Sequence, residues 1–218
     1  MKTTMVLLIS LAFAAPLAAQ TRPARTTTSG DTPAVSVRPF VMAVGERFAA
    51  KNTFEATFGQ SFEPFWGGGV QVALRDGIYV ELSASRFKKT GQRAFRFNGQ
   101  NFRLGIPLTA TLTPIELTAG YRLKLWRRFI PYGGLGYGSY GYKETSNFAD
   151  AGENVNTRRG GFLMVGGVEV RAHRWVGIGV DAAFTHVPGI LGKGGISKDA
   201  DENDLGGLAA RVKVIIGR

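Results

Sequence analysis

The chain has 218 residues and no cysteine, and its 27 Lys and Arg against 16 Asp and Glu give a formal net charge of +11. This length suits one domain, and no shift in composition near the middle of the chain indicates a second. The positive charge favours a polyanionic partner, either nucleic acid or an anionic surface, and the lack of cysteine agrees with an oxidising compartment.

The amino terminus is typical of a secretory signal peptide. Lys2 precedes the apolar run MVLLISLAFAA, residues 5–15, and the small residues Ala18 and Ala19 follow. We therefore predict a signal peptide over residues 1–19 that is cleaved after Ala19. Export removes nucleic acid as the expected partner and favours lipid headgroups or lipopolysaccharide. No later segment approaches the run of about 20 apolar residues that a membrane-spanning helix requires, so the exported chain would enter a membrane only as strands.

Residues 20–35 are rich in Thr, Ser, Pro and Arg without periodicity, which predicts a flexible leader. Residues 36–218 are expected to form one barrel domain, because apolar side chains recur there at every second position.

The first clear hairpin is expected in VQVALRDGIYVELSAS, residues 70–85, where the apolar positions are even-numbered on both sides of a break. A three-residue turn with Gly77 in the left-handed region keeps even residues opposite one another. Val72 should therefore pair with Val80.

A second hairpin is expected at RFNGQNF, where Asn98-Gly99 suits a two-residue type I′ turn and places Leu82 opposite Ile115. The preceding KKTGQR is too charged for lipid, so this hairpin should protrude beyond the membrane. The apolar phase slips near Thr113-Pro114, which predicts a bulge or bend.

Eight strands are predicted in all, and the long connections between them fall on one side. Their ranges are 37–49, 64–75, 77–97, 101–125, 129–142, 160–172, 175–187 and 205–217. An even number of antiparallel strands with short turns at one end is typical of an outer-membrane barrel. The predicted fold is all-β, an eight-stranded antiparallel up-and-down transmembrane β-barrel with a protruding extracellular hairpin.

The chain resembles the small outer-membrane barrels of the OmpA, OmpX and OmpW type over residues 36–218. The resemblance lies in the signal peptide, the alternating strands, FIPYGGLGYGSYGY with its Pro-Tyr-Gly opening, and the final strand GGLAARVKVIIGR. It implies location in the bacterial outer membrane and insertion by a barrel-assembly machinery. Such proteins usually finish with an aromatic residue, whereas this chain finishes with Gly217-Arg218.

Alternation alone leaves open which face of the barrel points inward. Aromatic residues near strand ends favour lipid outside, as two interfacial girdles require; these are Trp66, Phe87, Trp126, Phe129, Trp175 and Phe184. The non-apolar face carries charges of both signs, which predicts a lumen charge network. Its members are Glu81, Glu116, Arg122, Lys124, Glu169, Arg171, Asp181, Arg211 and Lys213.

Several short motifs suggest chemistry only weakly. The GYGSYG segment, residues 136–141, matches a dinucleotide fingerprint but precedes a polar loop instead of a helix. His186 has neither a serine two residues later nor an obvious Asp partner. The acidic run DADEND, residues 199–204, lacks the glycine and spaced Glu of a calcium loop. We therefore expect no catalytic, cofactor-binding or metal site, and no enzyme.

The expected function is that of a monomeric outer-membrane barrel with a structural or surface-interaction role. A salt-bridge network would close its lumen, and residues 88–100 would offer a surface to an extracellular partner. Two alternatives stay open: a narrow channel for small or apolar solutes, in which rearranged ion pairs open a water column, and a soluble periplasmic ligand carrier of the lipocalin kind.

Overall fold

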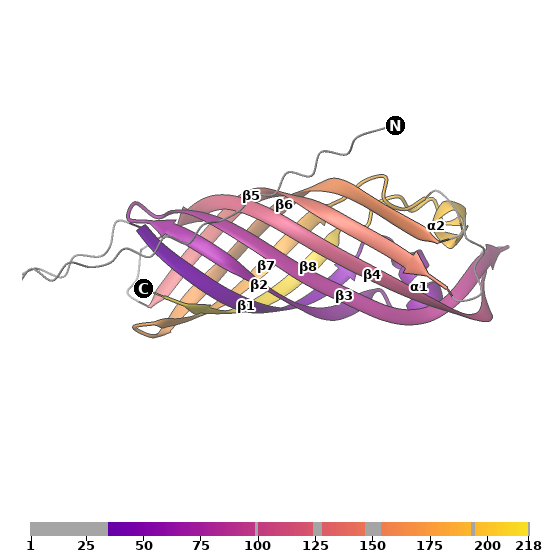
Figure 1. The fold of residues 1–218 in the computed structure, drawn as a ribbon, viewed down its shortest axis with the longest axis horizontal. Helices are drawn as coiled ribbons and strands as arrows, with labels where there is room; N and C mark the ends of the chain where they lie inside the picture. The colour runs from indigo at the N-terminus through magenta and orange to yellow at the C-terminus, as the bar shows by residue number, and fades with distance from the viewer. Residues whose placement is uncertain (1–34, 99, 124–127, 147–153, 193–194, 218) are drawn as a thin grey trace, which may run out of the picture. The chain divides into compact units, whose positions relative to one another are not determined.

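A computed structural model describes residues 35–98, 100–123, 128–146, 154–192 and 195–217. The predicted signal peptide and nearly all of the predicted leader lie outside these residues. Eight antiparallel strands, each paired with its neighbours in the sequence, close into a ring because β1 also pairs with β8 (Figure 1). The strands are β1 Val35–Phe48, β2 Phe62–Leu74, β3 Ile78–Phe97, β4 Gln100–Arg122, β5 Phe129–Thr145, β6 Val155–His173, β7 Val176–His186 and β8 Gly207–Ile216. The predicted all-β, up-and-down barrel is confirmed.

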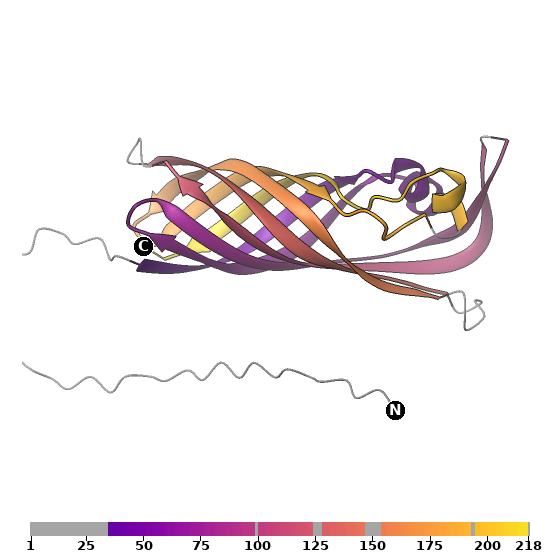
Figure 2. The ribbon, with the colours of Figure 1, turned by 90° about the horizontal axis from the view of Figure 1, so that it is seen from above.

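The two ends of the barrel differ. At one, the turn end, β2 and β3 are joined by a tight turn in which Gly77 has a φ of +95° and donates to Leu74 O at 3.1 Å. This left-handed conformation favours glycine, and Val72 pairs with Val80 as predicted. At the opposite, lid end, all connections except the one between β3 and β4 are longer, and both helices lie there (Figure 2).

The register of the hairpin between β3 and β4 corrects the sequence-based prediction. Its tip follows the expected two-residue turn, since Phe97 pairs with Gln100, but Leu82 pairs with Leu117 and not with Ile115. The difference arises at an irregularity where Arg93 alone stands opposite residues 104–106 of β4. Two extra residues there shift every pair nearer the turn end.

The predicted bulge at Thr113-Pro114 is also wrong. The pairs of β3 with β4 keep one register on both sides of this position, and Leu112, Pro114 and Glu116 all have buried side chains. The alternation of inward and outward side chains therefore continues. From this point toward the lid, the side chains in the lumen become mainly apolar.

The lid end contains helix α1, Lys51–Phe58, which lies between β1 and β2 in the chain and packs against aromatic side chains. Phe54 of α1 stacks on Phe48 with ring centroids 4.0 Å apart, and Phe58 and Phe87 lie beside them. The short helix α2, Gly195–Asp199, lies in the connection between β7 and β8. None of the helices in the described parts of the chain is long and apolar enough to span a membrane.

A carboxylate from the last connection caps α1. Glu202 accepts hydrogen bonds from the backbone N–H groups of Asn52 and Thr53, both at 2.8 Å, and from Thr53 Oγ1 at 2.7 Å. These N–H groups have no partner within the helix, so the carboxylate satisfies the free amino end of α1. The connection before β8 is thereby joined to the connection after β1.

Replacing Phe54 with Ala should loosen the lid, because removal of a fully buried ring typically costs about 3–5 kcal/mol. In the folded barrel, we expect trypsin to cleave after Lys51 faster than in the wild type, since α1 must open locally to be cut. Gln60→Ala, an exposed substitution in the same connection, is the control. Equal cleavage rates for both variants would show that α1 is not held by this packing.

Candidate functional site

The outer surface of the barrel wall is apolar. A belt of large apolar residues is exposed around it, and Leu117, for example, is 54% exposed. The belt includes Val41, Val70, Val80, Leu82, Leu117, Leu135, Phe162, Met164, Val180, Phe184, Leu208, Val212 and Val214. Glu81 and Arg211 are only 3% and 4% exposed. The charged face of the strands therefore points into the lumen.

The charges in the lumen are paired, beginning near the turn end. Glu169 of β6 lies between the guanidinium groups of Arg38 from β1 and Arg122 from β4. Arg122 Nη2 donates to Glu169 Oε2 at 2.6 Å, Arg38 Nη1 donates to the same oxygen at 2.9 Å, and Arg38 Nη2 donates to Oε1. All three side chains are buried, so each charge depends on the others for stabilisation.

Gln71 continues the contacts into the middle of the lumen. Its Oε1 accepts from Arg38 Nη1 at 2.9 Å, and its Nε2 donates to Glu81 Oε2 at 3.1 Å. Lys213 Nζ donates to Glu81 Oε1 at 2.6 Å and lies 3.3 Å from Asp181 Oδ2. The amide of Gln71 thus links Arg38 of β1 to Glu81 of β3, and each of these residues is its paired neighbour on an adjacent strand.

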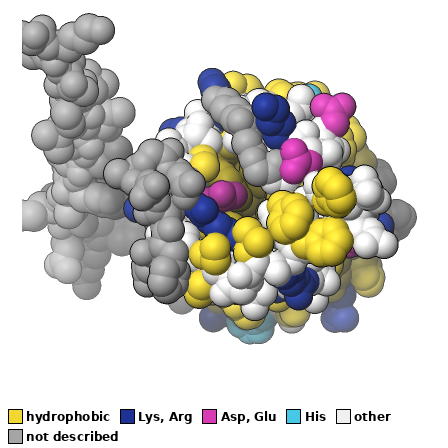
Figure 3. All heavy atoms as spheres, turned by 90° about the vertical axis from the view of Figure 1, so that its right-hand side faces the viewer, with side chains coloured by type: hydrophobic (Ala, Val, Ile, Leu, Met, Phe, Trp, Pro, Cys, Tyr) yellow, Lys and Arg dark blue, Asp and Glu magenta, His cyan; other side chains and the backbone are white. Residues whose placement is uncertain are grey.

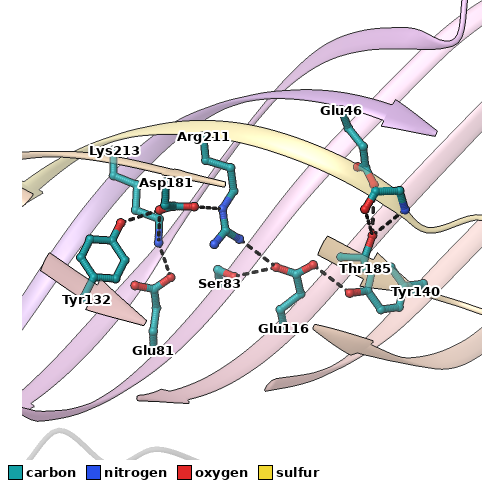
Figure 4. A network of polar contacts seen from close by, with 11 residues as sticks. Glu46, Glu81, Ser83, Glu116, Tyr132, Tyr140, Asp181, Thr185, Arg211 and Lys213 are labelled. Carbon is teal, nitrogen blue, oxygen red and sulfur yellow. Dashed lines mark hydrogen bonds and ion pairs between the residues drawn. The ribbon is translucent and has the colours of Figure 1, made fainter. Parts of the chain in front are cut away.

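The contacts end in a second group closer to the lid (Figure 4). Arg211 Nε donates to Asp181 Oδ1 at 2.5 Å, and Arg211 Nη1 lies 3.5 Å from Glu116 Oε2. Tyr132 Oη donates to Asp181 Oδ2 at 2.5 Å, and Tyr140 Oη donates to Glu116 Oε1 at 2.9 Å. The tyrosine hydroxyl groups donate to carboxylates without adding positive charge to this group.

These contacts form one continuous lumen network that contains a side chain from each of the eight strands. Its members are Arg38, Gln71, Glu81, Glu116, Arg122, Tyr132, Tyr140, Glu169, Asp181, Arg211 and Lys213. Four of them are cations and four are carboxylates, so the network is neutral when all eight are ionised. Because every member faces the lumen, the network crosses the barrel from wall to wall.

The structure brings seven of the nine sequence-predicted lumen charges into this network. Lys124 lies outside the described residues. The prediction is wrong for Arg171, whose side chain is exposed at the end of β6, where the register of β6 with β7 shifts. Beyond the end of the wall an inward position no longer faces a closed lumen.

Sequence reasoning missed Arg38, Gln71 and the two tyrosines of the network. Arg38 shares even numbering with the buried residues Phe40, Met42 and Val44 of β1, so the parity of that strand would have placed it inside. The tyrosines carry no charge, and nothing in their spacing distinguishes a network tyrosine from a girdle tyrosine.

Of the predicted girdle, Trp66, Phe129, Trp175 and Phe184 are exposed on the barrel surface. Trp126 lies outside the described residues. The prediction is wrong for Phe87, which is 2% exposed and packs in the lumen against the aromatic rings under the lid. Its odd number in β3 is that of the inward-facing residues Glu81 and Ser83, so parity outweighs position at a strand end.

Above the network, apolar side chains fill the lumen as far as the lid. They include Met42, Val44, Phe48, Phe54, Phe65, Phe87, Leu112, Leu163, Val187, Ile190, Leu191 and Leu205. A cavity of about 20 Å³, lined by Glu46, Glu116, Arg211 and Tyr140 among others, lies at the boundary between the charged and apolar layers. It is the size of about one water molecule.

The weak motifs of the sequence have structural uses. Residues 136–141 lie within β5, without the strand-to-helix turn that a dinucleotide site needs. His186 does have an acidic partner, since its Nδ1 lies 2.6 Å from Asp204 Oδ2. Asp204 Oδ1 also accepts from the backbone N–H groups of Val187 and Gly206, which fixes the end of this connection. Two carboxylates of the acidic run, those of Glu202 and Asp204, are thus already bonded to protein groups.

No protein-family model matches the sequence, and no curated protein matches it. Among solved structures, the chain is similar to the N-terminal β-barrel domain of Pseudomonas aeruginosa OprF, with 14% identity over 84% of this chain and 97% of that one and a TM-score of 0.46. Neisserial surface protein A matches with 10% identity over 85% and 96% of the two chains and a TM-score of 0.46. A major outer membrane protein from Thermus thermophilus matches with 10% identity over 84% and 99% and a TM-score of 0.48. At these identities the similarity concerns the fold alone.

Replacing Glu169 with Gln should destabilise the barrel strongly, because Arg38 and Arg122 would be left buried without their carboxylate. Breaking a buried pair in this way typically costs about 3–5 kcal/mol. Urea-induced unfolding from lipid vesicles, followed by tryptophan fluorescence, measures the change in the free energy of unfolding.

The matched control is Glu55→Gln, which removes a half-exposed carboxylate 3.8 Å from Lys51 on α1. Surface pairs of this kind contribute about 1 kcal/mol or less. Equal losses for the two variants would mean that the lumen network does not stabilise the barrel.

Proposed function

We propose that the protein is an integral barrel of the bacterial outer membrane, with the turn end in the periplasm and the lid end outside the cell. The observation that carries this proposal is the exposed apolar belt around a charged, buried lumen. A soluble ligand carrier would need the opposite arrangement, with its apolar face inside and its charges in water. Large exposed apolar surfaces of this extent are expected to contact lipid or another protein.

The dimensions of the belt support a membrane location. β7 and β8 have 11 and 10 residues, close to the 9–11 residues of a tilted strand that crosses the hydrocarbon layer. Trp175 and Phe129 lie near the turn end of the strands, whereas Phe184 and Trp66 lie nearer the lid end. The four side chains fit the two interfaces of a bilayer, where aromatic rings are enriched.

The charge of the outer surface supports an anionic lipid environment. On the described strands, all the exposed charged side chains belong to Lys or Arg, and none belongs to Asp or Glu. These residues are Arg47, Arg86, Lys88, Arg103, Lys143, Arg158, Arg159 and Arg171. All but Arg171 belong to the lid-end parts of their strands, where the phosphates of lipopolysaccharide would lie in the proposed orientation. Basic side chains at a membrane surface are attracted to such phosphates.

The proposed role is structural or surface-interacting, with a closed lumen. The network crosses the lumen between all eight strands, and packed aromatic and aliphatic side chains fill the space above it. An interior of eight strands is only wide enough for side chains, so little space is left for water. The proposal includes export by the signal peptide at residues 1–19, insertion by a barrel-assembly machinery, and a monomeric state.

A charge in the belt should prevent stable insertion. Val180→Arg places a cation among the outward-facing residues of β7, where it typically costs about 2–4 kcal/mol at the bilayer midplane. Thr90→Arg, an exposed position of β3 near the lid end, should be tolerated. Outer-membrane fractionation of cells that express each variant measures the inserted fraction. Equal insertion of both, or recovery of the wild type without detergent in the soluble fraction, would refute the membrane location.

Planar-bilayer recording tests the closed lumen separately. We expect the wild-type barrel to insert without conductance steps, because the paired charges and the apolar layer leave no continuous water column. Regular, ion-conducting steps from the wild type would favour the narrow channel and would leave the membrane location intact.

A further inference from the structure

The hairpin between β3 and β4 extends well beyond the other strands. β3 has 20 residues and β4 has 23, against 17 and 19 in β5 and β6 and 11 and 10 in β7 and β8. The pairing of β2 with β3 ends at Arg86, and the pairing of β5 with β4 ends at Thr109. Residues 92–107 therefore form a two-stranded ribbon that pairs with no further described strand (Figures 1 and 2).

One face of the ribbon is apolar and uncovered. Phe95 and Phe102 are a cross-strand pair whose rings stack with centroids 5.3 Å apart, and alternation places Phe97 and Leu104 on the same face. The four side chains are between 41% and 63% exposed. Moving exposed apolar side chains out of water lowers the free energy, so this face has the properties of a binding surface.

The opposite face of the ribbon is turned toward α1. Arg103, whose neighbours along the strand Phe102 and Leu104 face the other way, donates from Nε to Ala56 O at 3.0 Å and from Nη2 to Glu55 O at 3.2 Å. These carbonyl oxygens belong to the last turn of α1, where a cation is favourable. This contact fixes the orientation of the ribbon, so that its phenylalanine face points away from the lid.

The charged residues of the ribbon and its base are all basic, and one of them, Lys89, is paired with Glu63 of β2 at 2.6 Å. Residues 85–115 contain six basic residues and no Asp or Glu; the six are Arg86, Lys88, Lys89, Arg93, Arg96 and Arg103. Viewed from the lid end, exposed hydrophobic side chains lie beside Lys and Arg, and Asp and Glu side chains are also visible on this end of the molecule (Figure 3). A partner must therefore offer apolar contact and negative charge at the same place.

We propose that this ribbon is a docking surface for a second membrane outside the cell, an anionic phospholipid bilayer. The proposal rests on the membrane location proposed above and names a partner for the outer surface of the barrel. A bilayer interface supplies acyl chains for Phe95, Phe97, Phe102 and Leu104, and its phosphates suit Arg86 and Lys88, the exposed cations at the base of the ribbon. An acidic polysaccharide supplies the charge without an acyl phase. From Thr109 to the tip the strand covers about 30 Å, enough to carry the aromatic face beyond the membrane of the barrel itself.

The test uses the full chain inserted in nanodiscs of phosphatidylcholine. Flotation then measures its binding to vesicles of phosphatidylcholine alone and to vesicles that also contain phosphatidylglycerol. We expect binding to the anionic vesicles only, with a loss at high salt. The double variant Phe95→Ser/Phe102→Ser should bind at least about tenfold more weakly, and Arg86→Gln/Lys88→Gln should show a similar loss.

Val155→Ser is the matched control, because Val155 is an exposed apolar residue at the start of β6, on a different hairpin. All variants must first show the same heat-modifiable gel mobility as the wild type, which indicates a folded barrel. Equal binding of wild type and the double Phe variant overturns the proposal, as does equal binding to neutral vesicles. If the protein binds soluble dextran sulfate but no vesicles, the proposal of a lipid partner is wrong and the partner is an anionic polysaccharide. Failure of the wild type to enter nanodiscs would instead refute the membrane location.

Discussion

The interior of an eight-stranded barrel has room for side chains and little else, so any charge placed there must find its partner within the wall itself. This constraint explains the composition of the lumen network. Glu169 serves two arginines, Lys213 lies between two carboxylates, and tyrosine hydroxyl groups occupy the remaining carboxylate oxygens. Each ion holds two or three strands in register, so the pairing of charges and the closure of the ring stabilise each other.

The same limit on space accounts for the small residues on the inner face. A Cβ atom at Gly120 would lie 2.8 Å from the ring of Tyr79, and one at Gly134 would lie 2.7 Å from its hydroxyl oxygen. Large and small residues on neighbouring strands therefore fit against each other. Where the network ends, near Glu116 and Tyr140, the inner positions become mainly apolar, and aromatic rings pack under α1. The carboxylates of Glu46 and Glu63 are also buried here, and they contact Thr185 and Lys89.

Alternation of side chains was sufficient to predict the architecture. All eight strands, the turn at Gly77 and the polar lumen follow from the parity of apolar positions, because a strand in a barrel wall has one face in and one face out. The parity of β3 and β1 also predicts that Phe87 and Arg38 are buried. Phe87 was assigned to the girdle because it is an aromatic residue near a strand end, and Arg38 was missed because the inner face of β1 is mostly apolar. The shift of Leu82 toward Leu117 could not be predicted in this way, since two extra residues at 104–106 conserve the parity of both strands.

The contact between Glu202 and the amino end of α1 joins parts of the chain that are 150 residues apart. The carboxylate comes from the segment that leads into β8, and the helix follows directly after β1. The cap is therefore complete only once the first and last strands have found each other. The capped helix and the seam between β1 and β8 therefore support each other, so a change that opens this seam should also free the amino end of α1.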